Sequence, residues 1–305
     1  MRAHLFARLL PPWLSLLLVV LLCGCASSSV QPPVEPLINA APVVKRLPRV
    51  GLALGGGAAR GFAHIGVIQV LEEAGLRPDM IVGTSAGSLV AAIYARGKTG
   101  VQLQQIAETM EEATLTDWTL PIFSRGMLRG EALARYVNFQ VGGTLIENMV
   151  IPLGIVATDL NSGEGILFRR GDTGVAVRAS SAVPSIVQPV RIGTHEYVDG
   201  GLVAPVPVRY ARQMGAEFVV AVDISNVPMG NTADGAVQVL LQTFTIMSKS
   251  INTFELRDAD VVVTPALKGV SGADFSSRRR LIDAGRAAML AALPQYREKL
   301  ASLMR

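Results

Sequence analysis

The stretch that decides the fold is MIVGTSAGS, residues 80–88. Its first three residues form an apolar run, the next five read Gly-Thr-Ser-Ala-Gly, and a helix is predicted from there to about Arg96. Small residues two positions before and after Ser85 permit a sharp turn that exposes its Oγ in front of a helix N-terminus. The stretch predicts a strand–turn–helix unit with Ser85 as a candidate nucleophile. The alternative is that Ser85 or Ser88 serves only as the helix N-cap.

A glycine-rich loop, GGGAARG at residues 55–61, precedes this unit and also joins an apolar run to a predicted helix. A dinucleotide fingerprint would need glycine in place of Ala58 or Arg60, and the Gly-Lys-Ser/Thr of a phosphate loop does not follow. The loop instead suits an oxyanion hole. Backbone N–H groups of Gly56, Gly57 and Ala58 would converge on a tetrahedral oxyanion, and Arg60 would add positive charge.

Predicted strands and helices alternate along the rest of the chain. Apolar strand-like runs lie at residues 50–54, 80–82, 151–158, 165–169, 188–192, 196–198, 218–223 and 260–263. Helical patterns lie at residues 62–74, 101–112, 174–182, 233–252 and 278–304. This alternation of continuous apolar runs with helices predicts an α/β fold, with a mainly parallel central sheet and helices on both faces. Ligands of such sheets bind beyond the carboxyl ends of the strands, where both glycine-rich turns lie.

The sequence offers an acid for Ser85 but no histidine in the usual order. The α/β-hydrolase triad places a histidine after the acid, whereas the three histidines are His4, His64 and His195. None of them follows Asp199, so we favour structural roles for the two that lie in the body of the chain. Asp199 itself ends a short predicted strand and precedes two glycines. Its alternative interpretation is an ordinary Asp-Gly turn residue.

Three motifs taken together resemble those of the patatin-like phospholipase family. They are the glycine-rich loop Gly56-Gly57-Ala58-Ala59-Arg60-Gly61, the turn Gly83-Thr84-Ser85-Ala86-Gly87, and Asp199-Gly200-Gly201. The resemblance covers about residues 49–225. It departs at Ala58, where the family often has glycine; alanine keeps the backbone donor unless the position needs a positive φ.

The resemblance implies a patatin-like fold and hydrolysis of lipid acyl esters by a dyad, with Ser85 as nucleophile and Asp199 as general base. It implies no cofactor and no metal, and a phospholipid or lysophospholipid of a membrane as substrate. An acyltransferase would use the same residues, and a non-catalytic periplasmic lipoprotein is the other alternative. The apolar segment at residues 115–128 is either a membrane-facing lid or part of the core.

Composition excludes several other classes of protein. The formal net charge is +4, and Arg2 and Arg8 near the N-terminus contribute two of these charges. So small an excess, without a basic stripe, gives no nucleic-acid footprint. The only cysteines are Cys23 and Cys25, which excludes a disulfide framework and a cysteine-based metal site in the body of the chain.

The N-terminus has the pattern of a secretory signal, because two arginines precede an apolar run at residues 13–22 that is short for a bilayer span. Leu22-Cys23-Gly24-Cys25 resembles the bacterial lipoprotein box, with Cys25 as the lipidated residue. No acidic residue follows directly, which by the same resemblance favours a periplasm-facing anchor in the outer membrane. A plain signal peptide and an uncleaved anchor are the alternatives.

Three regions are therefore expected along the chain. Residues 1–24 are predicted to be a signal peptide. Residues 25–48 would hold the lipid-anchored cysteine and a tether rich in proline and serine. Residues 49–305 would form the patatin-like hydrolase domain.

Overall fold

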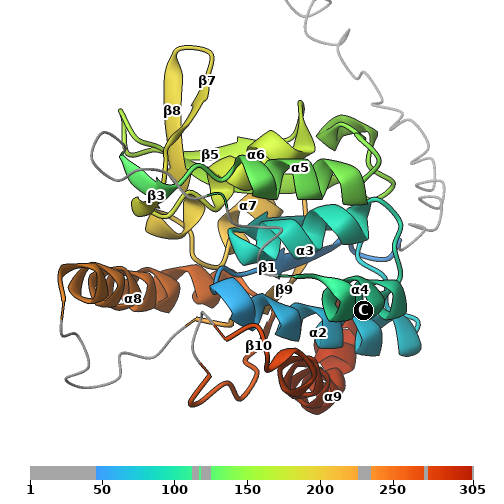
Figure 1. Cartoon of the computed structure of the whole chain (residues 1–305). Coiled ribbons are helices and arrows are strands. Elements are labelled where there is room, and N and C mark those ends of the chain that lie inside the picture. Colours follow the sequence, from blue (N-terminus) through green and yellow to red (C-terminus); the bar gives the residue numbers. More distant parts are fainter. Residues whose placement is uncertain (1–45, 112–116, 118–124, 226–234, 271–273, 304–305) are drawn as a thin grey trace, which may run out of the picture. The chain divides into compact units, whose positions relative to one another are not determined.

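The computed structural model describes residues 46–111, 117, 125–225, 235–270 and 274–303 (Figure 1). The predicted signal peptide, Cys25 and the tether up to residue 45 lie outside the described residues. So do residues 115–116 and 118–124, which make up most of the predicted lid or core segment. Among the described residues, no helix has the length and apolar character needed to cross a membrane.

An eight-stranded sheet lies at the centre of the part of the chain that the structure describes. Its strands are β1 (Val50–Leu54), β2 (Met80–Thr84), β4 (Leu153–Asp159), β5 (Gly165–Phe168), β7 (Val190–Ile192), β8 (His195–Asp199), β9 (Phe218–Val222) and β10 (Val261–Val263). They follow the order β10-β9-β1-β2-β4-β8-β7, and β5 also pairs with β4. Neighbours from β10 to β4 are parallel, whereas β5, β7 and β8 pair antiparallel. The sheet is therefore mixed, with the predicted parallel arrangement in its central strands.

Helices cover both faces of this sheet. They are α2 (Phe62–Glu73), α3 (Ala86–Ala95), α4 (Gly100–Thr109), α5 (Glu131–Gln140), α6 (Thr173–Ser180), α7 (Val208–Gln213), α8 (Ala236–Glu255) and α9 (Arg278–Leu303). Leu52 and Ile81 share one core with α2, α3 and α9. Ala53 and Val82, the next residues along the same strands, pack with α7 in a second core. Because successive side chains point to opposite faces, strands buried on both faces read as continuous apolar runs.

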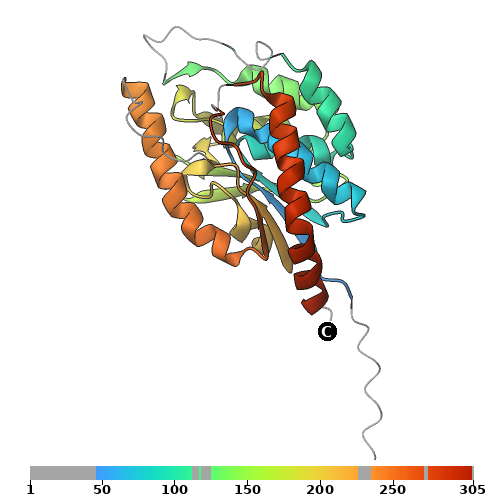
Figure 2. The ribbon, with the colours of Figure 1, turned by 90° about the horizontal axis from the view of Figure 1, so that it is seen from below.

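Shorter elements connect these layers. They are β3 (Gly126–Leu128), which pairs with β6 (Ser185–Val187), and the 3-10 turns η1 (Ala58–Gly61), η3 (Ile146–Asn148), η4 (Gly200–Leu202) and η5 (Leu256–Asp258). Figure 2 shows α9 on one side of the sheet and α8 on the other. The two helices therefore belong to opposite layers.

Two glycines let α9 lie directly against α2. A Cβ added to Gly66 would come within 2.0 Å of the Ile282 carbonyl oxygen, and one added to Gly285 within 1.9 Å of the Ala63 oxygen. Such distances are far below van der Waals contact, so neither position accepts a side chain without moving the helices apart. The pair sets the spacing of the helical layer that covers this face.

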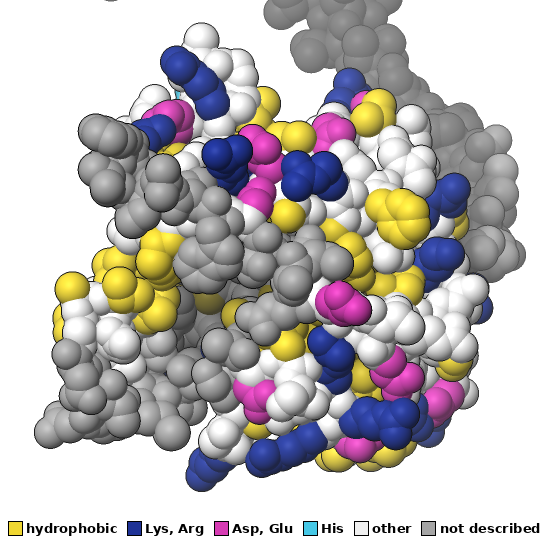
Figure 3. Space-filling view, viewed as in Figure 1, with side chains coloured by type: hydrophobic (Ala, Val, Ile, Leu, Met, Phe, Trp, Pro, Cys, Tyr) yellow, Lys and Arg dark blue, Asp and Glu magenta, His cyan; other side chains and the backbone are white. Residues whose placement is uncertain are grey.

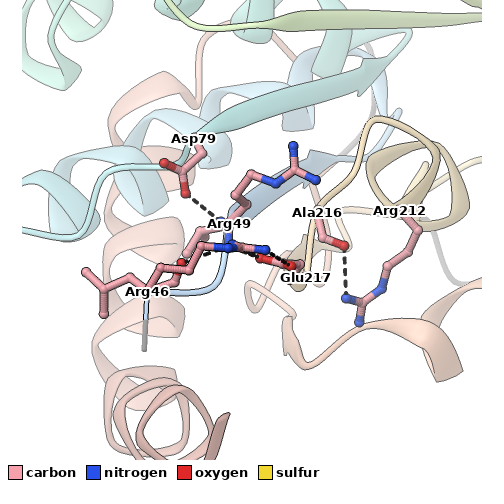
Figure 4. Close-up of polar contacts among 8 residues, drawn as sticks. Arg46, Arg49, Asp79, Arg212, Ala216 and Glu217 are labelled. Atoms are coloured by element: carbon pink, nitrogen blue, oxygen red, sulfur yellow. Dashed lines mark hydrogen bonds and ion pairs between the residues drawn. The ribbon is translucent and has the colours of Figure 1, made fainter. Parts of the chain in front are cut away.

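Polar contacts close the amino-terminal end of the central strands (Figure 4). The Arg46 guanidinium donates to both carboxylate oxygens of Glu217, at 2.6 and 2.5 Å, and the Arg49 amide donates to the same carboxylate at 2.9 Å. The Val50 amide donates to Asp79 Oδ2 at 2.6 Å. These residues precede or begin β1, β2 and β9, so the contacts hold the register of the three strands at the end opposite the glycine-rich turns.

Candidate active site

The structure brings Ser85 and Asp199 together. The Ser85 hydroxyl donates to Asp199 Oδ2 at 2.7 Å, and the Gly201 amide donates to Asp199 Oδ1 at 2.7 Å. Both oxygens of the buried carboxylate therefore have a partner. One partner is the candidate nucleophile, and the other is the turn that follows the acid.

Strand register explains why these two residues meet. β4 pairs with β2 up to Val156, opposite Thr84, and with β8 from Ala157, opposite Asp199. Because β5 occupies the other edge of β4 at these same positions, β2 and β8 share one edge of β4 and meet there end to end. Ser85 directly follows β2, and Asp199 is the last residue of β8. The switch from parallel to antiparallel pairing thus creates the site.

The turn at Ser85 is strained and tightly packed. Ser85 has φ 52° and ψ −124°, a backbone conformation that non-glycine residues rarely adopt. A Cβ at Gly83 would lie 2.4 Å from the Gly87 oxygen, and one at Gly87 would lie 2.2 Å from the Leu54 oxygen. Only glycine fits at these two positions, which is the physical reason for the Gly-x-Ser-x-Gly pattern here.

Neither serine caps helix α3 with its side chain, although Ser85 occupies the N-cap position. The Ser85 side chain makes no capping hydrogen bond to α3 and faces Asp199 instead. The Ser88 hydroxyl donates to the Ser85 carbonyl oxygen at 2.6 Å. The geometry therefore does not support a role limited to helix capping for Ser85 or Ser88.

Ser180, at the end of α6, is a residue of this site that the sequence did not reveal. Its hydroxyl accepts from the Ser85 amide at 2.8 Å and donates to the Val156 carbonyl at 2.5 Å. It thereby joins the strained turn to β4. Its only sequence signal is a serine near the end of a short predicted helix, which any capping serine would also give.

The glycine loop lies against the serine turn, but one of its predicted donors is already occupied. The Gly56 amide donates to the Pro205 carbonyl at 2.9 Å, because the loop closes onto the segment between η4 and α7. This corrects the assignment of Gly56 as an oxyanion donor. Within the described residues, the amides of Gly57 and Ala58 show no hydrogen bond, and both residues line a cavity together with Ser85.

Arg60 is placed to support this loop. Its buried side chain donates from Nε to the Gly57 carbonyl at 3.2 Å. Because a trans peptide points its N–H opposite to its C=O, this bond fixes the direction of the Ala58 N–H. Burial lowers the pKa of Arg60 to about 10, partly offset by Asp223, so the side chain stays charged at neutral pH. Ala58 has φ 50°, so alanine occupies a position that favours glycine, at a strain of about 1 kcal/mol.

The cavity beside the serine has a volume of about 530 Å³. Its polar floor comes from the glycine loop, Ser85 and Asp199. Its apolar walls come from Val183, Ile186 and Leu202 on one side and from Leu241, Phe244 and Met247 of α8 on the other. This size and lining suit the apolar part of a ligand whose reactive group lies at the polar floor.

Burial changes the pKa of Asp199. It raises the pKa of Asp199 to about 6, while the hydrogen bonds from Gly201 and Ser85 oppose that rise. A carboxylate with a pKa near 6 is ionised at neutral pH and remains basic enough to accept a proton, as general base catalysis requires.

The two histidines of the domain lie away from the Ser85 hydroxyl. His64 is fully buried with Nε2 2.8 Å from the Gly55 carbonyl, and burial lowers its pKa to about 4. It is therefore neutral and donates from Nε2 to the loop. His195 begins β8, and its Nδ1 lies 2.6 Å from Asp159 Oδ2. It lies four positions before Asp199 in the same strand, about 13 Å away at the usual rise per residue.

His195→Ala and His64→Ala are expected to keep ester hydrolysis within about tenfold of wild type in protein that is folded. His64→Ala leaves the buried Gly55 carbonyl without its donor, so it should also lower the free energy of unfolding by about 1–3 kcal/mol. Initial rates on a short-chain ester, with melting temperatures recorded in parallel, check both results. A rate as low as that of a Ser85 variant, in a folded histidine variant, would restore a triad.

Among the described residues, no group of three or more His, Cys, Asp or Glu side chains could hold a metal ion. A serine at a strained strand-to-helix turn, bonded to a buried carboxylate beside a glycine loop, has the geometry of a serine hydrolase. The family model named patatin-like phospholipase matches residues 52–212. Since the match spans more than half of the 305 residues, the chain belongs to the patatin-like phospholipase family.

Individual relatives agree with this membership. An uncharacterized NTE family protein of Mycobacterium tuberculosis is 35% identical over 204 residues, which cover 67% of this chain and 56% of that protein. Patatin-like phospholipase domain-containing protein 6 of Mus musculus is 33% identical over 186 residues, covering 58% of this chain and 14% of that protein. The chain thus spans about half the length of the first relatives that it matches.

A solved structure is similar in fold. The crystal structure of VipD from Legionella pneumophila superposes with a TM-score of 0.54 at 14% identity, covering 82% of this chain and 67% of that one. With the family match, this confirms the predicted patatin-like α/β fold with helices on both faces of the sheet.

Proposed function

We propose that this chain is a serine acyl hydrolase of the phospholipase A or lysophospholipase type, with Ser85 and Asp199 as its catalytic dyad. The observation that carries the proposal is the 2.7 Å hydrogen bond from the Ser85 hydroxyl to the buried Asp199 carboxylate. Membership in the patatin-like phospholipase family supports lipid esters as the substrate class. The apolar cavity that opens at Ser85 is consistent with an acyl chain as the bound group.

The first half of the reaction follows from this geometry. Asp199 takes the hydroxyl proton as Ser85 Oγ bonds to the ester carbonyl carbon, and the carbonyl oxygen becomes an oxyanion. The Gly57 and Ala58 amides stabilise that charge. The tetrahedral intermediate then collapses, the ester C–O bond breaks, and protonated Asp199 returns the proton to the leaving alkoxide. An acyl-serine and a free alcohol remain.

Water completes the cycle through the same groups. The water oxygen attacks the acyl-serine carbonyl while Asp199 takes a proton from that water. The Gly57 and Ala58 amides stabilise the second oxyanion. The Ser85 oxygen leaves and recovers its proton from Asp199, releasing a fatty acid. Because one carboxylate acts as base and then acid in each half, no imidazole is needed.

The test is the release of fatty acid from defined phospholipids and lysophospholipids by the purified chain, followed by mass spectrometry. Hydrolysis predicts free fatty acid as the acyl product. If added alcohols instead receive the acyl group in preference to water, the chain is an acyltransferase that uses the same dyad. No turnover of any lipid or short-chain ester, together with no labelling by a fluorophosphonate, would leave only a non-catalytic role.

The hydrolysis rate is expected to depend on pH through Asp199. The base works only when it is ionised, so kcat/KM for a neutral ester should rise with pH through an apparent pKa of about 6 and then level off. Below that pKa the rate should fall about tenfold per pH unit. A pH profile on a soluble ester measures this. A midpoint near 4 would mean that burial does not shift the acid.

The predicted lipid anchor on Cys25 and the periplasm-facing outer membrane location belong to this proposal. They rest on the N-terminal sequence pattern. An anchor of this kind would hold the hydrolase near membrane lipids. Mass spectrometry of the mature N-terminus tests it, and an unmodified or absent Cys25 would contradict it.

A further inference from the structure

Helix α8 is long and carries little charge. Its 20 residues, AVQVLLQTFTIMSKSINTFE, contain one lysine, Lys249, and one acid, Glu255. Glu255 is buried and forms an ion pair with Arg209 of α7. Lys249 is thus the only charged side chain that α8 exposes along its length.

The outward face of α8 is exposed and carries apolar side chains among hydroxyl groups. Val239 and Ile246, two turns apart on the same side, are 52% and 54% exposed, and Phe254 near the end is 64% exposed. The hydroxyls of Thr243 and Thr253 donate to backbone carbonyls one turn earlier in the helix. The hydrogen-bond donors of these two exposed side chains are therefore satisfied within α8. Hydrophobic side chains gather where α8 lies, in the space-filling view of Figure 3.

The carboxyl-terminal end of α8 is held firmly to the domain. Buried Asn252 donates to the Ser225 hydroxyl at 2.8 Å and accepts from the Val206 amide at 3.2 Å. The Glu255–Arg209 ion pair adds a second fixed point. Earlier turns of the same helix form a wall of the catalytic cavity through Leu241, Phe244 and Met247. One face of α8 therefore lines the cavity while the opposite face meets solvent.

We infer that the outward face of α8, centred on Val239 and Ile246, docks onto an anionic lipid bilayer and places the catalytic cavity beside the lipid. This inference rests on the proposed function. A helix with an apolar face and an exposed cation suits the boundary between head groups and acyl chains, where Lys249 meets anionic lipid. Met247 both lines the cavity and reaches solvent, so the docked face continues into the site at that residue.

A site-specific reporter tests the docking directly. The only native cysteines are Cys23 and Cys25, so the full chain with both changed to serine accepts one label. An environment-sensitive dye on Ile246→Cys should shift to the blue on vesicles of phosphatidylglycerol and phosphatidylethanolamine. The same dye on Phe139→Cys of α5, 81% exposed in the native chain, should not shift. Equal shifts at both positions, or none, would overturn the inference.

A second arm removes the apolar face without touching the cavity lining. Val239→Gln with Ile246→Gln should slow hydrolysis of vesicle phospholipid about tenfold or more, since each residue loses burial in lipid. The matched control, Val101→Gln with Phe139→Gln, removes two apolar residues elsewhere that are more exposed than the tested pair and should leave that rate unchanged. Both pairs should hydrolyse a soluble short-chain ester at the wild-type rate.

The remaining outcomes separate the two proposals. A wild type that cleaves no soluble ester contradicts the proposed function, while the dye still reports whether α8 enters the bilayer. A blue shift that grows with protein concentration in the absence of vesicles means that a second copy of the chain covers α8, and overturns the bilayer as its partner. Lys249→Glu should weaken the shift on anionic vesicles. An unchanged shift would contradict the inference that Lys249 directs α8 to anionic lipid.

Discussion

Ser85→Ala is expected to abolish hydrolysis of every ester that the wild type cleaves, and to abolish labelling by a fluorophosphonate. Among the described side chains, the Ser85 hydroxyl is the only one that donates a hydrogen bond to Asp199 Oδ2. Without this oxygen no acyl-enzyme can form. The fold should survive, because alanine is smaller than serine and the turn keeps its glycines. Labelling, initial rates and a melting curve on the same preparation measure all three effects.

Ser88→Ala is the matched control for this prediction. Ser88 lies three residues further on, in the first turn of α3, and its hydroxyl donates to the Ser85 carbonyl and not to Asp199. Its loss should leave labelling and hydrolysis within about tenfold of wild type. Wild-type labelling of the Ser85 variant, or loss of labelling only in folded Ser88→Ala, would show that Ser85 is not the nucleophile.

Asp199→Asn should lower ester hydrolysis at least a hundredfold, since general base catalysis typically contributes about 10²–10⁴-fold. Asparagine has nearly the same shape, and its oxygen can still accept from the Gly201 amide. Its NH₂ group, however, cannot take the serine proton. Hydrolysis of a short-chain ester at pH 8 measures the loss. Asp159→Asn, which changes a buried carboxylate at the end of β4, should remain within a few-fold of wild type.

The same variant should also change how stability depends on pH. Asp199 has a folded-state pKa of about 6, raised from 3.8 by burial, so its ionised form destabilises the fold as pH rises through that range. A shift of about two units corresponds to about 3 kcal/mol. Asp199→Asn should therefore melt at or above the wild type at pH 8, and the difference should vanish near pH 4. An activity within a few-fold of wild type would mean that Asp199 is not the base, and a large drop in melting temperature would mean that it is mainly structural.

Local patterns predicted much of this molecule. The unit around Ser85 was readable because strand, tight turn and helix are contiguous and each has its own signal. The strands β4, β5, β7 and β8 were each predicted from a short apolar run, and in the structure they form two antiparallel pairs, β4 with β5 and β7 with β8. Asp199 was found for the same reason, since a strand delivers it to a pair of glycines.

What the sequence did not reveal depends on contacts between distant segments. The bond from the Gly56 amide to Pro205 joins two loops that no local pattern links. Ser180 reaches the Ser85 amide from a position 95 residues further along the chain. The antiparallel strands were each predicted from the sequence. The sequence did not show that β8 and β2 would pair with the same edge of β4, one after the other. Helix α7 was missed because six residues are too few to show a helical period.

The meeting of β2 and β8 on one edge of β4 also bears on how the chain folds. The two residues bonded in the site are 114 positions apart, and β1 pairs with β9, whose first residue, Phe218, lies beyond the family-matched segment that ends at residue 212. Contacts of such long sequence separation form slowly, because loop closure precedes their gain. In a nascent or unfolded chain Ser85 and Asp199 are therefore not in contact. Hydrolysis is expected to begin only after the central sheet has formed.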